Sequence, residues 1–185
     1  MSAREDTLVM ITLKDLASWV SFDQSEEGIA KTMRQIRHWT QNDLLQTRSQ
    51  KNTGKGIPRL YSEEPTLQIA GILAELSRYA SSIDVLKPVA EALYEEYEEG
   101  ALYLSVALTE MNAFLQVAWT FDPKTQGITG AETTFFDEIE DWNERVFNFT
   151  APSSILINMS QVSERIYDNK FGGIPYVERI GRATS

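Results

Sequence analysis

Residues 28–61 read GIAKTMRQIRHWTQNDLLQTRSQKNTGKGIPRLY, and this stretch decides the fold of the first half of the chain. Past Gly28 the apolar residues recur at helical intervals, which predicts a helix with bases and amides on its other faces. Its apolar positions are Ile29, Met33, Ile36 and Leu44. After Leu45, two glycines and a proline exclude helix, and the polar tip Asn52-Thr53-Gly54 favours a turn between two short extended arms. The stretch therefore predicts a helix followed by a basic hairpin.

A shorter helix is predicted just upstream. Thr12 and Asp15 have the spacing of a capping box, so the helix starts after Thr12, and it ends by the polar stretch 21–27. Its apolar positions are Leu13, Leu16, Ala17 and Val20. Two helices joined by a short polar segment, with bases on the second, indicate a helix-turn-helix. The basic hairpin that follows is typical of a wing.

The charge of the chain is unevenly placed. The formal net charge is -10, which taken as a whole argues against a nucleic-acid binder. However, residues 29–61 hold seven bases and one acid, whereas residues 62–185 hold eight bases and twenty acids. This asymmetry is what a DNA-contacting head joined to an acidic body would show, because the acid repels DNA from every other surface. A solvated basic loop on an acidic surface is the simpler alternative.

Composition excludes much of enzyme chemistry. The 185 residues include no cysteine and one histidine, His38, so a thiolate zinc site, a cysteine nucleophile and a cluster of histidine ligands are all excluded within one subunit. The acidic runs 95–99 and 137–141 are solvated helix faces rather than metal sites on this interpretation. A P-loop at Gly54-Lys55 fails because the earlier glycine is missing and Gly56 stands where Ser or Thr is required. We expect no catalytic residues, metal or cofactor.

The second half of the chain predicts an α+β unit. A helix capped by Ser62 carries Ile69, Leu73, Leu76 and Ala80, and a turn at 83–86 leads to a helix that starts at Pro88 and stops at Gly100. The next predicted element is a β-hairpin over 102–121 with its turn at 109–112. It is followed by a helix through Phe135, Ile139, Trp142, Val146 and Phe147, a strand at 153–159 and a helix at 162–167. The predicted domains are a winged helix-turn-helix over 1–87, a linker helix over 88–100 and a sensing or dimerisation domain over 101–185.

Four segments, in order, resemble the MerR family of bacterial transcription regulators. Residues 35–45, QIRHWTQNDLL, are similar to the recognition helix of that family, and residues 56–64, GIPRLYSEE, to the segment that closes its wing. Residues 12–17 resemble its first helix and residues 82–86 a later segment. Gln35, Thr40 and Asp43 depart from the usual residues, and the helix that ends near Gly100 is too short for the long coiled coil through which many members dimerise.

The resemblance implies a winged head on duplex DNA that works as a homodimer on an inverted repeat. No stretch approaches the ~18 to 20 uninterrupted apolar residues of a membrane span and the N-terminus lacks a signal-peptide core, so we expect a cytoplasmic protein. Double-stranded DNA is the expected partner, RNA polymerase and a small-molecule effector are further candidates, and no membrane is expected. The DNA-binding residues implied by the resemblance and by the chemistry of Arg, Lys and Gln side chains are Lys31, Arg34, Gln35, Arg37, His38, Trp39, Lys51, Lys55, Arg59 and Tyr61. For Tyr61, core packing is the equal alternative.

Two other functions stay open. An excisionase-like or architectural DNA-binding protein would share the winged head, although such proteins normally lack an added domain as large as 101–185. A ligand-binding or protein-binding module whose head has lost DNA binding is the other. The basic segment favours a DNA binder over that module.

Overall fold

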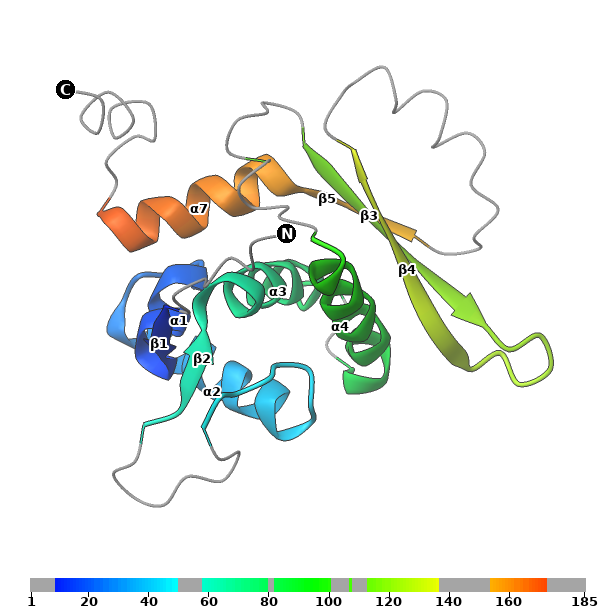
Figure 1. Cartoon of the computed structure of the whole chain (residues 1–185), viewed down its shortest axis with the longest axis horizontal. Helices are drawn as coiled ribbons and strands as arrows, with labels where there is room; N and C mark the ends of the chain where they lie inside the picture. The colour runs from blue at the N-terminus through cyan, green and yellow to red at the C-terminus, as the bar shows by residue number, and fades with distance from the viewer. Residues whose placement is uncertain are drawn as a thin grey trace, which may run out of the picture.

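The computed structural model describes residues 9–49, 58–79, 82–100, 107, 113–136 and 154–172 (Figure 1). These residues form a mixed α+β structure with two small antiparallel sheets, in agreement with the predicted class. In chain order the elements are β1 (Met10–Thr12), α1 (Leu13–Val20), α2 (Glu26–Gln41), β2 (Leu60–Ser62), α3 (Glu63–Leu76), α4 (Ile83–Glu98), β3 (Phe114–Phe121), β4 (Ile128–Phe136), β5 (Ser154–Asn158) and α7 (Met159–Phe171).

The first helix begins and ends as its sequence predicts. The Thr12 hydroxyl accepts a hydrogen bond from the Asp15 amide, and the Asp15 carboxylate accepts one from the Thr12 amide, which completes the capping box. The four apolar positions of α1 are all buried, and Ser21 is its C-cap. The capping box thus fixes where the head starts.

The second helix starts earlier and ends sooner than predicted. Ser25 is the N-cap, and its hydroxyl accepts a hydrogen bond from the Gly28 amide, so α2 begins at Glu26 rather than after Gly28. Two glutamates in the first turn also favour this start, because they lie at the positive end of the helix dipole. Asp43, with φ of 63°, ends the helical path, so Leu44 is buried in a turn rather than on the helix.

The next two helices differ from the prediction at their ends. α3 stops at Leu76, before the predicted Ala80, and Ser62 occupies its N-cap position without a side-chain capping hydrogen bond. α4 starts at Ile83, so the predicted turn at 83–86 is wrong and Pro88 lies inside the helix. A proline near a helix start removes one backbone hydrogen bond, and burial of Leu86, Val89, Ala90 and Leu93 offsets that loss.

The hairpin of the second half lies further along the chain than predicted. β3 pairs antiparallel with β4, and Asp122 closes the intervening turn by accepting hydrogen bonds from the amides of Lys124 and Thr125. The prediction placed Phe135 in a helix, whereas it lies in β4. Of residues 101–112, the structure describes only Ala107, which is helical. The helix predicted through Phe135 was expected to continue over residues 139–147, which lie outside the described ranges.

The C-terminal strand and helix are confirmed, and they join the two halves of the chain. β5 pairs antiparallel with the other edge of β3, which gives the order β4-β3-β5. α7 is longer than predicted and packs against α1 and α3, above which it lies in Figure 1. Val162 and Ile166 of α7 belong to the same cluster of buried side chains as Leu16 and Leu73. One continuous core therefore runs through the segments that the sequence divides into three domains.

Candidate nucleic-acid interface

A row of exposed bases follows one side of α2. Lys31, Arg34 and Arg37 are spaced three residues apart and exposed, so they share a face of the helix. His38 is also exposed in the last turn, and Gln35 is half-buried beside this row. The opposite side of α2 carries the buried residues Ile36, Trp39 and Thr40. As predicted, α2 is amphipathic: its apolar face is buried and its bases are exposed to solvent.

A hollow of about 490 Å³ adjoins this row and brings in bases from two other segments. Lys14 comes from the first turn of α1, Arg37 from α2, and Arg59 from the residue before β2. The remaining lining residues are Thr12, Leu13, Met33 and Pro58. The Nη1 atom of Arg59 is buried and has no hydrogen-bond partner among the described residues. Three cationic groups from separate segments thus surround one concave site.

Of the segment predicted to form a wing, the structure describes only residues 46–49 and 58–61. The Arg48 amide donates to the Leu60 carbonyl at 2.9 Å, and the Leu60 amide donates to the Ser49 hydroxyl at 3.1 Å, so the two arms meet as expected of a hairpin. The exposed Arg48 also donates through Nε to Ser62 at 3.0 Å. Lys51 and Lys55, together with the tip at 52–54, lie outside the described residues.

Two of the predicted DNA contacts are part of the core. Trp39 is 2% exposed and Tyr61 is fully buried, so neither side chain reaches the surface as a contact residue would. The Tyr61 hydroxyl lies 3.1 Å from the Thr40 hydroxyl and forms a buried hydrogen bond between β2 and α2. The burial of Tyr61 agrees with core packing, which the sequence offered as the alternative to DNA contact. Both aromatic rings instead support the helix that carries the bases.

The basic residues of this site are not neutralised by nearby acids. In the described ranges, no carboxylate lies within ion-pair distance of Lys14, Lys31, Arg34 or Arg37. The ion pairs of that part of the chain lie elsewhere, between Glu75 and both Arg78 and Arg165, and between Lys170 and Glu63. Unpaired cations on one face keep their full attraction for a polyanion. We name Lys14, Lys31, Arg34, Arg37 and Arg59 the basic face.

The chain just after α2 is tied to α4. The Gln46 amide donates to the Tyr94 hydroxyl at 2.9 Å, and burial raises the pKa of Tyr94 to about 12, so this hydroxyl stays protonated at neutral pH. At the other end of α2, the Ser25 amide and hydroxyl donate to the Asp23 carboxylate and hold its pKa below the usual value. Both ends of the basic helix are therefore held in place by specific hydrogen bonds.

Sequence reasoning missed Lys14 as a member of the basic face. Its only sequence signal is its place inside the capping box, and nothing in the spacing relates it to Arg37 or Arg59. Pairing of β1 with β2 brings the start of α1 next to residue 59. Among the described residues, no group of acids and histidines could hold a metal ion, and no helix is long and apolar enough to cross a membrane.

Neither a family model nor a curated protein matches this chain.

Proposed function

We propose that this protein is a sequence-specific DNA-binding transcription regulator whose winged helix-turn-helix head contacts duplex DNA through the basic face, as a homodimer on an inverted repeat. One observation carries the proposal: exposed bases of α1 and α2 and the half-buried Arg59 of the arm before β2 gather at one site of a chain whose net charge is -10. An α-helix fits the major groove of B-form DNA, and Arg side chains on it can bind guanine edges.

The basic residues would make two kinds of DNA contact. Arg34, Gln35 and Arg37 lie on the helix that would enter the major groove, where they can contact base edges. Lys55 of the wing would contact sugar and phosphate, which positions a protein on DNA without reading its sequence. Residues 101–185 would serve dimerisation or effector sensing. The C-terminal helix α7 packs against α1 and shares its core, so packed side chains connect this half of the chain to the head.

The test begins with selection of bound fragments from genomic DNA by the purified protein. An inverted repeat between promoter elements is the expected motif. Arg37→Ala should cost about 1–3 kcal/mol on the selected site and much less on scrambled duplex, because a base contact is lost. Lys55→Ala should weaken binding to both duplexes alike and lower the salt slope by roughly one unit, because one phosphate contact is lost.

Lys124→Ala is the matched control, since Lys124 is exposed in the β3–β4 turn away from the basic face. Fluorescence anisotropy at several salt concentrations compares the three variants with the unchanged protein. If the control weakens binding as much as Lys55→Ala, net charge alone explains the affinity. If none of the substitutions affects any duplex, the basic face does not bind DNA.

A further inference from the structure

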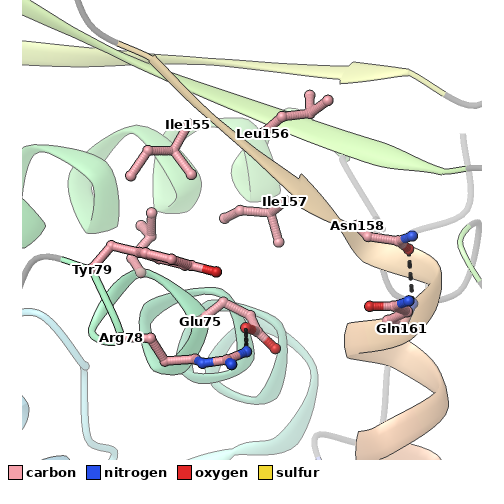
Figure 2. Close-up of a pocket in the computed structure, with 9 residues that line it drawn as sticks. Glu75, Arg78, Tyr79, Ile155, Leu156, Ile157, Asn158 and Gln161 are labelled. Atoms are coloured by element: carbon pink, nitrogen blue, oxygen red, sulfur yellow. Dashed lines mark hydrogen bonds and ion pairs between the residues drawn. The ribbon is translucent and has the colours of Figure 1, made fainter.

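A second hollow, of about 210 Å³, lies between the end of α3 and strand β5 (Figure 2). Ile155 and Ile157 point from β5 toward Tyr79 at the end of α3, while Leu156 points to the other side of the strand (Figure 2). Tyr79 is 71% exposed and Leu156 is 40% exposed, although both are large apolar side chains. Two exposed large apolar side chains of the described residues therefore lie in or beside this strand.

Among the described residues, no strand pairs with the second backbone edge of β5. Within the described ranges it pairs only with β3. The Met159 amide donates to the Ala113 carbonyl at 2.8 Å, and antiparallel hydrogen bonding alternates along a strand. Ile157 and Ile155 thus bond to β3, which turns the N–H and C=O groups of Leu156 and its alternate neighbours toward the open edge. An unpaired edge of this kind is a template for another strand.

The sequence of β5 lacks the devices that normally protect such an edge. Ser154-Ile155-Leu156-Ile157-Asn158 contains no charge, no proline and no glycine, and three of its five residues are strongly apolar. Its character is also symmetric about Leu156, with an isoleucine on each side and a small polar residue beyond each isoleucine. A strand of this pattern is complementary to a second copy of itself in antiparallel orientation.

We propose that two copies of this protein associate through β5, which pairs antiparallel with β5 of the second copy about a two-fold axis at Leu156. Leu156 then faces Leu156 of the second copy, and the two exchange both backbone hydrogen bonds, as outward-directed pairs do. Ile155 faces Ile157 of the second copy on the side of the hollow, and Ser154 faces Asn158. The two three-stranded sheets become one continuous six-stranded sheet.

The hollow adds buried surface area to an interface that would otherwise consist of one strand edge. A stable dimer buries about 800 Å² per partner, which is more than a five-residue strand edge provides. In the proposed pairing, the isoleucines of the second copy would enter the hollow and cover Tyr79, which is 71% exposed. The nearby Arg78 pairs with Glu75 at 3.2 Å, and Arg165 pairs with the same carboxylate. The pairing deepens the proposed function, because it supplies the dimer that an inverted repeat requires.

Charge substitutions at the two-fold axis test the pairing. Leu156→Lys and Leu156→Glu each place like charges opposite one another in the dimer, while the side chain lies on an exposed position of the monomer. Sedimentation velocity should find the unchanged protein dimeric and each variant at least about tenfold weaker in self-association. An equimolar mixture of the two variants should regain the dimer, because opposite charges then face each other. Misfolding of either variant cannot produce this recovery.

Met10→Lys is the matched control, since Met10 is also 40% exposed in a strand but lies in the other sheet. It should leave the dimer intact. A monomeric unchanged protein, dimers that persist in both Leu156 variants, or a mixture that stays monomeric would overturn the pairing. Sedimentation uses no DNA, so a dimer that behaves as expected but binds no duplex refutes the proposed function alone.

Discussion

At the scale of single residues, Gly28 determines how closely the first turn of α2 approaches the connection that follows α1. It lies in the first turn of α2, and a Cβ atom there would stand 2.4 Å from the backbone oxygen of Asp23 and 2.6 Å from its Cβ. The Asp23 backbone oxygen cannot move aside to make room for a Cβ atom, as the end of a flexible side chain could. The short connection between the two helices, closed by the hydrogen bonds of Ser25 to Asp23, therefore requires a residue without a side chain at this position.

Gly28→Ala should destabilise the protein. In an ordinary helix interior the same change stabilises by about 1 kcal/mol, because alanine loses less backbone entropy on folding. Here the overlap with Asp23 reverses the sign, and we expect a net loss of about 1–3 kcal/mol in chemical denaturation. Glu27→Ala changes an exposed neighbour in the same turn and should stay within about 0.5 kcal/mol of the unchanged protein. A more stable Gly28→Ala protein would contradict the close approach.

At the scale of elements, α7 fastens the connection between α1 and α2 to the rest of the fold. The Asn169 side chain donates to the carbonyls of Trp19 and Ser21, both at 2.9 Å. Lys170 pairs with Glu63 at the start of α3 and lies 4.8 Å from the centroid of the Trp19 ring. One turn of the C-terminal helix therefore contacts the end of α1 and the start of α3, although 107 to 150 residues separate the contacting partners in the chain.

Asn169→Ala should lower the free energy of unfolding by about 1–3 kcal/mol, because two partly buried carbonyls lose a donor. Asn169→Asp has the same shape but directs a carboxylate at both carbonyls, so its loss should be at least as large. Glu164→Ala, at an exposed position of the same helix, is the control and should be nearly neutral. Urea denaturation compares the variants. Equal stability of all three would show that the packing of Val162 and Ile166 alone holds α7.

At the scale of the whole molecule, the charge distribution couples stability to pH. Lys and Arg gather on the head, whereas α4 and β4, which pack together, carry acids. Glu96 of α4 accepts a hydrogen bond from the Thr133 hydroxyl of β4. Burial raises the pKa of Glu96, the hydrogen bond from Thr133 lowers it less, and Glu99 adds a smaller upward effect. Folding therefore favours the protonated form of this one carboxyl.

Stability should fall as the pH rises through the folded pKa of Glu96. A raised folded pKa means that the stabilising contribution is complete below the ordinary value of 4.5 and is lost above the folded pKa. Glu96→Gln keeps an acceptor for Thr133 without the charge, so it should raise the melting temperature at neutral pH and flatten the decline above pH 4.5. Glu95→Gln, which removes the same charge from an exposed neighbour, should leave that decline unchanged. The reverse ranking of the two variants at neutral pH would refute the assignment.

The amino-acid sequence by itself determined the features that depend on neighbouring residues. The capping box at Thr12 and Asp15, the apolar stripe of α1 and the apolar run of β5 follow from side chains three or four residues apart, or adjacent ones. The bases of α2 were predictable as an exposed face for the same reason. Burial of Leu13, Leu16, Ala17 and Val20 agrees with this local information.

Tertiary structure alone decided which distant segments meet. The strand β3 could pair with residues before it or after it, and its partner β4 was decided by the turn at Asp122 and by packing on α4. Burial of Trp39 and Tyr61, the place of Lys14 on the basic face, and the core that α7 shares with α1 all depend on contacts between segments remote in sequence. Such contacts reflect the summed burial of many side chains, which no local pattern of residues encodes.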